Sequence, residues 1–332
     1  MKQFKTGLVV GKFSPLHLGH ELLIQRATDA CDTTFIISYS LPELPGCEAH
    51  KREQWLRARF PDAVVLVVDK DMPHNDDDAL MHRRFCASLC MDALGTTVEA
   101  VFTSEDYGDG FALELGRYFT ERTGRPHMVR HVSVDQARSA VPVSGTMART
   151  DPHAHRRFLS DVVYASFVDR VCILGGESSG KTTLAAALAE RLDTAWVPEY
   201  GRELWVAQDG VLNYEDMARI GRTQLQREAQ ARLQAKRFLF CDTSPLTTLF
   251  YSREMFGRAD PALEAMADAP YERFFLCTPD FDFIQDGTRR DVDFRQQQHR
   301  WYLDELSRRK LPYVLLTGTL EQRVADAIAQ LG

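Results

Sequence analysis

Long apolar runs and an excess of positive charge are both missing from this sequence of 332 residues. No stretch reaches the length of about 18 apolar residues that a membrane-spanning helix needs. The opening residues, 1–13, lack the apolar segment of a secretory signal peptide. The formal net charge of −7 argues against a general nucleic-acid binder, whose surface would be basic. We therefore expect neither a membrane nor a nucleic acid among the partners.

Cysteine occurs in no pattern that binds zinc. The closest pair, Cys86 and Cys90, is not a CxxC pair, and no cysteine shares zinc spacing with histidine. The odd count of seven indicates reduced thiols and a cytoplasmic location. A hydrophobic content of 44% and a charged content of 26% are ordinary for a soluble globular protein. The length predicts roughly two domains.

What the sequence does contain is a P-loop pattern, Gly-x4-Gly-Lys-Thr, within residues 171–183 (VCILGGESSGKTT). An apolar strand leads into it, and leucines at helical spacing follow it. Backbone N–H groups of such a turn surround a polyphosphate at the start of a helix. Lys181 is expected to reach the outer phosphates, and Thr182 to hold Mg²⁺. The residues predicted to contact the nucleotide are Gly175, Glu177, Ser178, Ser179, Gly180, Lys181, Thr182 and Thr183.

Two further turns in the first half have the features of anion sites. Residues 11–20 (GKFSPLHLGH) follow an apolar strand and open a helical pattern, with His17 and His20 near the helix start. Imidazoles there can donate to a phosphate, although an isolated pair of this kind more often caps a helix or lies on the surface. Ser144 is expected to cap another helix, with Arg149 one turn further on. Strands and helices alternate through residues 7–150, which predicts a parallel α/β sheet.

These two turns resemble the HxGH and SxTxxR signatures of the nucleotidyltransferase superfamily. The resemblance implies a Rossmann-like domain that transfers a nucleoside monophosphate from ATP or CTP to a phosphorylated acceptor and releases pyrophosphate. Such a reaction needs no nucleophilic side chain, only positioning and stabilisation of charge. The resemblance implies nucleotide contacts at Gly11, Phe13, Ser144 and Thr146. It implies catalytic roles for Lys12, His17, His20 and Arg149.

The second half continues as a P-loop kinase of the small-molecule type. Glu199, in the stretch EYGRE after a predicted strand, is placed to take a proton from a substrate hydroxyl, and Arg202 to bind phosphate. The alternative is that EYGRE only starts a helix, with Glu199 on the surface. Asp242 ends an apolar strand in the Walker B position, where it would hold water on Mg²⁺ or act as base. The choice between Glu199 and Asp242 as base stays open. Residues 286–300 indicate either a lid, with Arg289 on the transferred phosphate, or a solvated basic loop.

The order of all these motifs resembles the NadR family. That family implies a nicotinamide mononucleotide adenylyltransferase at 1–167 and a ribosylnicotinamide kinase at 168–332. Together they would convert nicotinamide riboside through nicotinamide mononucleotide to NAD, with ATP and Mg²⁺. Some relatives carry an N-terminal helix-turn-helix domain, for which we expect no room here.

One departure from the family concerns the aromatic residue that contacts nicotinamide. The family often has Trp directly before EYGR, where this chain has Pro198. The aromatic wall of the kinase pocket would then come from Trp196, from Tyr200 or from elsewhere. Trp55 is the candidate for the nicotinamide contact in the first domain.

Two other functions remain open from the sequence. One is a fused phosphopantetheine adenylyltransferase and dephospho-coenzyme A kinase, which shares the domain order and both reaction classes. The other is a nucleotide-sensing regulatory protein with weak catalysis. The intact lysine, threonine and histidines of the motifs favour an enzyme. A homo-oligomer is also left open.

Overall fold

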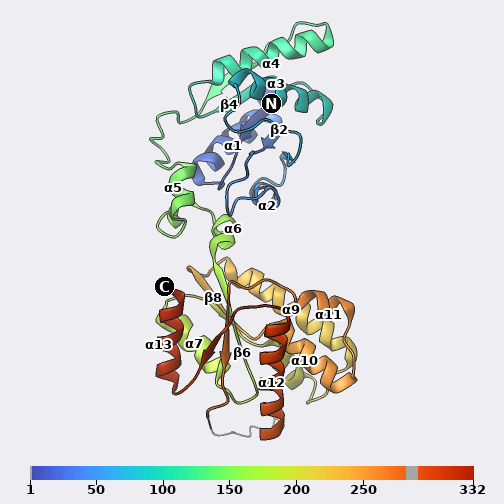
Figure 1. Ribbon diagram of the computed structural model, residues 1–332. Helices are drawn as coiled ribbons and strands as arrows, with labels where there is room; N and C mark the ends of the chain where they lie inside the picture. Colours follow the sequence, from blue (N-terminus) through green and yellow to red (C-terminus); the bar gives the residue numbers. More distant parts are fainter. Residues whose placement is uncertain (1, 282–290) are drawn as a thin grey trace. The chain divides into compact units, whose positions relative to one another are not determined.

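The computed structural model describes residues 2–281 and 291–332. The chain forms two compact units, Met1–Phe167 and Val168–Gly332 (Figure 1). Each unit is built around a five-stranded sheet whose strands pair in parallel. The α/β fold with two parallel sheets that the sequence predicts is therefore confirmed.

The first unit has strand order β3-β2-β1-β4-β5. Its strands are β1 (Phe4–Gly11), β2 (Cys31–Ser38), β3 (Val64–Val67), β4 (Ala100–Thr103) and β5 (Arg130–Ser133). Its helices are α1 (Leu18–Ala30), α2 (Ala49–Arg59), α3 (Ala79–Asp92), α4 (Gly108–Thr123), α5 (Gly145–Thr150) and α6 (Asp161–Tyr164). Short 3₁₀ turns lie at Arg156–Phe158 and Ala165–Phe167.

Alternate residues of the central strand β1 supply the two cores of this unit. Leu8 joins a cluster with side chains of α3 and α4, whereas Val9 is buried on the opposite face, where α1 packs. Successive strand residues point to opposite faces, so a strand covered on both sides is apolar throughout. Each such buried aliphatic side chain contributes about 1.5–3 kcal/mol. The apolar residues by which β1 is predicted thus lie in the middle layer of the unit, with helices on both faces of the sheet.

The second unit has strand order β10-β9-β6-β8-β7. Its strands are β6 (Asp169–Gly175), β7 (Trp196–Val197), β8 (Phe238–Asp242), β9 (Arg273–Cys277) and β10 (Val314–Leu316). Its helices are α7 (Lys181–Arg191), α8 (Tyr200–Ala207), α9 (Tyr214–Arg232), α10 (Pro245–Phe256), α11 (Pro261–Met266), α12 (Val292–Arg308) and α13 (Leu320–Leu331).

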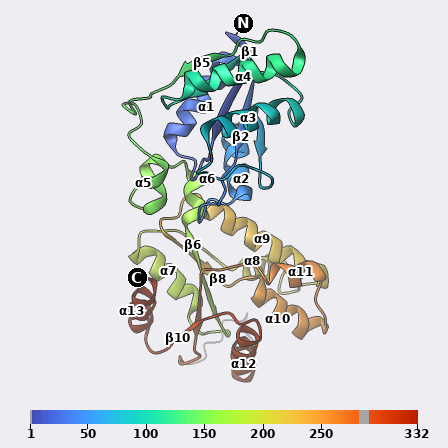
Figure 2. The same cartoon turned by 45° about the horizontal axis from the view of Figure 1, so that its top comes forward.

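Helices cover both faces of the second sheet. Residues of α7 and α13 form one core with one side of β6, and residues of α8 to α12 form the other core with its other side. Figure 2 shows α9, α10 and α11 grouped on one side of this sheet and α7 and α13 on the other. Ligands of such sheets bind beyond the carboxyl ends of the strands where the order of connection reverses. In the second unit that position lies beyond β6, between β8 and β9.

Candidate functional site

The turn after β6 has the backbone geometry of a phosphate-binding loop. Gly175 has a φ of 151°, and a Cβ there would lie 2.5 Å from Ser179 Oγ. Gly180 has a φ of 80°, a conformation that glycine adopts without strain. Lys181 begins α7, and its Nζ donates to the carbonyl of Gly176 at 3.0 Å. The turn therefore requires glycine at both motif positions and holds the lysine against the loop.

A buried arginine of α13 supports this loop from behind. Arg323 is 1% exposed, and its guanidinium donates to the carbonyls of Ser179, Thr278 and Gly318 at 2.7, 2.9 and 3.0 Å. These carbonyls belong to the P-loop and to the loops that follow β9 and β10. One side chain thus links three turns at the carboxyl edge of the sheet.

The end of β8 meets the first turn of α7. Thr182 Oγ1 donates to Asp242 Oδ2 at 2.5 Å, and Asp242 is 1% exposed. The other carboxylate oxygen, Oδ1, is buried and has no hydrogen-bond partner among the described residues. Burial raises the pKa of Asp242, although Lys181 and the Thr182 hydroxyl oppose the shift. A hydroxyl and an unsatisfied carboxylate oxygen form a donor set that suits Mg²⁺, directly or through water.

Glu199 lies at the end of β7 as the N-cap residue of α8. The stretch EYGRE does begin a helix, as one interpretation of the sequence has it, but Glu199 also lines a cavity. Burial raises the pKa of the Glu199 carboxyl, and the nearby Asp242 raises it further, against the charges of Lys181 and Arg202. The two carboxyls are thus close enough to influence one another, beside the P-loop lysine.

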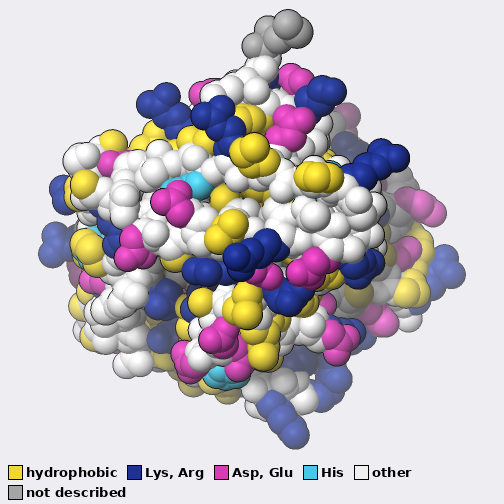
Figure 3. Space-filling model, turned by 90° about the horizontal axis from the view of Figure 1, so that it is seen from above, with side chains coloured by type: hydrophobic (Ala, Val, Ile, Leu, Met, Phe, Trp, Pro, Cys, Tyr) yellow, Lys and Arg dark blue, Asp and Glu magenta, His cyan; other side chains and the backbone are white. Residues whose placement is uncertain are grey.

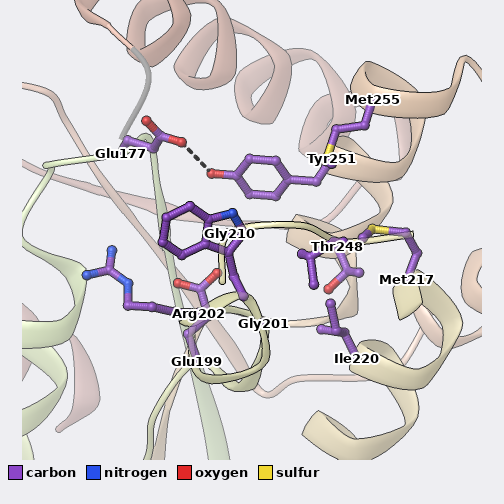
Figure 4. Close-up of a pocket in the computed structure, with 12 residues that line it drawn as sticks. Glu177, Glu199, Gly201, Arg202, Gly210, Met217, Ile220, Thr248, Tyr251 and Met255 are labelled. Carbon is purple, nitrogen blue, oxygen red and sulfur yellow. Dashed lines mark hydrogen bonds between the residues drawn. The ribbon is translucent and has the colours of Figure 1, made fainter. Parts of the chain in front are cut away.

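A cavity of about 290 Å³ opens between α8, α9 and α10 (Figure 4). One part of its wall is polar, and the other carries rings and aliphatic side chains. Figure 4 shows the Tyr251 ring and an indole facing the same space, with Glu177 and Arg202 at its edge. The lining residues are Glu177, Glu199, Gly201, Arg202, Trp205, Gly210, Leu212, Met217, Ile220, Thr248, Tyr251 and Met255. The size and lining are those of a site for a small molecule with an apolar or aromatic end.

A second cavity, of about 440 Å³, lies next to the first. Its lining includes Thr182 and Asp242, and it shares Glu199 and Arg202 with the first cavity. One carboxylate and one guanidinium therefore face both the aromatic pocket and the side chains that suit Mg²⁺.

Several residues of the aromatic pocket were not expected from the sequence. Trp205 follows Gly201 and Arg202 by one helical turn, so the spacing within α8 is a signal that was available. Its ring packs against Gly210, where a Cβ would lie 3.0 Å from the indole. Tyr251 comes from α10, and only tertiary packing brings it to the pocket.

Three expected positions in this unit need correction or qualification. Tyr200 does not line the pocket, because its ring is covered by the Arg227 guanidinium at 4.5 Å from the ring centroid. Trp196 packs instead against the core formed with α7 and α13. Arg289 lies outside the described residues. Among the described residues, the aromatic side chains that line the pocket are therefore Trp205 and Tyr251.

In the first unit, the histidine pair stands at the start of α1 beyond β1. The rings of His17 and His20 are stacked, with centroids 3.6 Å apart, and His17 Nδ1 accepts from the His20 backbone N–H at 3.3 Å. This bond leaves the proton of a neutral His17 on Nε2. Burial lowers the pKa of His17 to about 4 and that of His20 well below its usual value. Both imidazoles are thus neutral at pH 7, so each offers one N–H donor rather than a full charge.

The second turn of this unit packs directly on the first. Arg149 of α5 donates to the carbonyl of Ser14, and a Cβ on Gly145 would lie 3.3 Å from the same oxygen. Ser144 caps α5 by accepting from the N–H of Met147 at 3.2 Å. Thr146 is exposed. The structure therefore brings these two turns together, since this hydrogen bond joins residues that are 135 positions apart in the sequence.

The remaining expected residues of the first unit differ in what they can contact. Lys12 is exposed next to the histidine turn, and Gly11 ends β1. Phe13 is 1% exposed, and its ring lies edge-on to His20, so it supports that ring from inside. Trp55 was expected to contact nicotinamide, and this is corrected: its ring is 0% exposed and its Nε1 donates to Ser166 Oγ at 2.8 Å. That indole belongs to the core of the unit.

The surface carries charges of both signs. On the face shown in Figure 3, lysine and arginine side chains lie beside aspartate and glutamate side chains. Within the described residues, no helix is both long enough and apolar enough to span a membrane.

Known proteins are similar to this chain across both units. A model described as "AAA domain" matches residues 170–323. The curated "Trifunctional NAD biosynthesis/regulator protein NadR" of Escherichia coli (strain K12) is 29% identical over 309 residues, covering 87% of this chain and 72% of that protein. The protein of the same name from Salmonella typhimurium is 26% identical over 318 residues, with the same coverage.

Solved structures agree at the level of the fold. A crystal structure of NadR protein in complex with NR matches with a TM-score of 0.76 at 21% identity, covering 99% of this chain and 95% of that one. Another, in complex with NAD and AMP-PNP, matches with a TM-score of 0.73 at 20% identity, covering 100% and 97%. The resemblance seen in the motifs is confirmed: the chain is a homologue of NadR over 87% of its length.

Proposed function

We propose that the chain is a bifunctional enzyme of NAD biosynthesis. Residues 168–332 would phosphorylate nicotinamide riboside with ATP, and residues 1–167 would transfer the adenylyl group of ATP to nicotinamide mononucleotide, giving NAD. The observation that carries the proposal is the pair of cavities that share Glu199 and Arg202, with aromatic rings on one side and Thr182 and Asp242 on the other. The relation to NadR supports the choice of substrate.

The aromatic pocket suits the base and sugar of a riboside. The rings of Trp205 and Tyr251 offer flat apolar surfaces for a heteroaromatic ring. Glu199 and Arg202 are the polar side chains that line both cavities, and the ribose would lie beside them. The 5′-hydroxyl then faces the γ-phosphate of ATP on the loop.

The transfer needs positioning and one proton acceptor. The 5′-oxygen attacks the γ-phosphorus, the bond from that phosphorus to the β–γ bridging oxygen breaks, and ADP leaves. Glu199 lines both cavities, so it is the better placed carboxylate to accept the hydroxyl proton, and its raised pKa suits this role. Asp242 and Thr182 are the residues that would hold Mg²⁺. When bound, Mg²⁺ neutralises charge on the phosphates.

The first unit would use its two packed turns for adenylyl transfer. A phosphate oxygen of nicotinamide mononucleotide attacks the α-phosphorus of ATP, the bond to the α–β bridging oxygen breaks, and pyrophosphate leaves. His17 offers a donor at Nε2, and His20 lies stacked on it. Arg149 and Lys12 supply the positive charge near this turn. Neutral donors and charged donors are thus available at one helix start.

The test is a reaction of the purified chain with ATP, Mg²⁺ and nicotinamide riboside, with product identified by chromatography. We expect nicotinamide mononucleotide and then NAD. A parallel reaction with dephospho-coenzyme A tests the alternative fused enzyme of coenzyme A biosynthesis. Formation of coenzyme A with no product from the riboside would refute the proposal, and turnover of neither would favour a nucleotide-sensing protein.

A further inference from the structure

Side chains from three segments of the first unit hold the carbonyl of Lys12, which directly follows β1. Its oxygen accepts from Ser14 Oγ at 3.0 Å and from Ser38 Oγ at 3.3 Å, and Ser38 ends the neighbouring strand β2. Arg52 of α2 contacts both Ser38 and the carbonyl, with Nη1 2.9 Å from Ser38 Oγ and 3.5 Å from the Lys12 oxygen. The peptide that leads from β1 into the histidine turn is therefore held in one orientation.

The direction of the Ser38 hydroxyl depends on Arg52. A guanidinium has no acceptor, so in their hydrogen bond Ser38 Oγ accepts from Arg52. The single proton of the hydroxyl is then available for the Lys12 carbonyl. Arginine, serine and carbonyl thus form a chain of hydrogen bonds from α2 to the turn. Loss of the guanidinium would let the hydroxyl rotate to another acceptor.

The stability of the core does not by itself explain an arginine at this position. The residue is 0% exposed, and its Nε has no hydrogen-bond partner among the described residues. Its Nη2 donates to Glu43 Oε1 at 3.1 Å, and that side chain is 38% exposed. A buried charge with an unsatisfied N–H group lowers stability, and an apolar side chain of similar volume often stabilises such a site better. The hydrogen bonds toward the histidine turn give a reason for the arginine.

The fixed peptide leads into a residue with an unfavourable backbone conformation. Phe13 has a φ of 47°, in the left-handed region, which bulky side chains rarely adopt and which persists only where the surroundings enforce it. The carbonyl before it is the one that accepts from Arg52, and the carbonyl of Ser14 after it accepts from Arg149. The Phe13 ring lies edge-on to His20, with centroids 5.1 Å apart. The backbone at Phe13 therefore determines where the imidazole is supported.

We propose that Arg52 is a positioning residue for adenylyl transfer in the first unit. Through Ser38 and the Lys12 carbonyl, it fixes the backbone on which the His20 ring is supported. Because Arg52 is 0% exposed, it acts on the reaction through the turn and not by contact with a substrate. The inference rests on the proposed adenylyl transfer and adds to it a residue outside the HxGH and SxTxxR signatures.

The test measures adenylyl transfer from ATP to added nicotinamide mononucleotide. Arg52→Met removes the guanidinium and keeps a long side chain, whereas Arg52→Lys restores a donor. We expect kcat to fall about twentyfold in Arg52→Met and to recover to within about fourfold of the wild type in Arg52→Lys, with KM for both substrates changed less than about twofold. Calorimetric titration with nicotinamide mononucleotide counts the folded sites. Because kcat is expressed per site, a loss that comes only from unfolding does not lower it.

Two further variants provide a second test and a control. Ser38→Ala interrupts the chain of hydrogen bonds with little change in volume, and kcat per site should fall about fivefold. Arg57→Met makes the same substitution at an exposed arginine of α2 that is paired with Glu53, and it should change neither kcat nor KM.

The outcomes separate the inference from the function on which it rests. An unchanged kcat per site in Arg52→Met, or in Ser38→Ala where Arg52→Met does not fold, would overturn the positioning role. Equal falls in Arg52→Met and Arg52→Lys would overturn it as well. A wild type that transfers no adenylyl group would instead refute the function proposed for the first unit, and the positioning role with it.

Discussion

In both units the turn that we propose binds phosphate follows a central parallel strand and opens a helix, but the two turns differ in chemistry. Beyond β6, glycines bend the backbone and Lys181 supplies a full positive charge. Beyond β1, the site has two stacked imidazoles that burial keeps neutral at pH 7. A lysine ammonium is a point charge on a flexible side chain, so it can stay close to a phosphate that moves. A neutral N–H donor requires one direction of approach. If both turns bind phosphate as proposed, the same position in a parallel sheet serves two kinds of site, one based on charge and one on hydrogen-bond direction.

The largest effect is expected at the charged site. Lys181→Ala removes the cation beside the P-loop, and riboside phosphorylation should fall roughly a thousandfold because charge on the transferred phosphate loses its partner. Adenylylation of added nicotinamide mononucleotide should persist. Both rates are measured on the same preparation. Lys236→Ala, at an exposed lysine paired with Asp193, is the matched control and should leave both rates unchanged.

The second prediction concerns the histidine pair of the first unit. His20→Ala should lower adenylyl transfer roughly a hundredfold, since one donor and the stacking partner of His17 are lost. Phosphorylation of the riboside should continue. His50→Ala, at an exposed position of α2, serves as the control. Loss of both activities in a folded His20→Ala protein would contradict the two-site model.

Acid should lower the free energy of unfolding of the first unit. The folded-state pKa of His17 is about 4, below an unfolded value of 6.5, so the unfolded chain binds more protons between these values. Stability is therefore fully present above pH 6.5 and is lost as pH falls toward 4. Between pH 7.5 and 5 the contribution of His17 amounts to roughly 2 kcal/mol.

This pH dependence can be followed by urea unfolding at several pH values. His17→Gln should make the dependence shallower, because glutamine does not titrate and the lowered pKa of His20 remains. If the slope is the same in the variant and the wild type, His17 is not buried in neutral form as the structure has it.

The smallest effects are expected at two of the four tryptophans, Trp205 and Trp55. Trp205→Leu removes an aromatic ring from the proposed riboside pocket, and KM for the riboside should rise about fivefold with little change in kcat. Trp55→Phe should leave KM for either pyridine substrate unchanged while lowering the midpoint of thermal unfolding, because that indole is buried and bonded to Ser166. A raised KM for nicotinamide mononucleotide in Trp55→Phe, with unaltered stability, would restore Trp55 as a ligand contact.

The sequence allowed the parallel sheets and the phosphate turns to be predicted because their signals are local. A buried strand is a short apolar run, and the P-loop needs glycine at fixed spacing for reasons of backbone conformation. Trp55 was misjudged for the opposite reason. It lies in a basic helix that reads as exposed, and the hydroxyl that binds its indole is 111 residues away.

The residues that line the proposed riboside pocket could not be predicted for the same reason. Tyr251 and Met217 reach the cavity only because α9 and α10 pack together, and no spacing in the sequence relates them to EYGRE. Glu177 is predicted to contact the nucleotide because it lies within the P-loop motif. Its hydrogen bonds to Tyr251 and Gln298 could not be predicted from that motif, because both residues come from helices far along the chain.

The guanidinium of Arg323 gives the last helix a part in nucleotide binding. Since it bonds the carbonyls of Ser179, Thr278 and Gly318, the P-loop is held by a residue that follows its lysine by more than a hundred positions. A chain truncated before Leu320 would still contain the complete Gly-x4-Gly-Lys-Thr motif, yet its loop would lose this non-covalent cross-link. An intact nucleotide signature in a shortened homologue therefore does not guarantee a competent kinase.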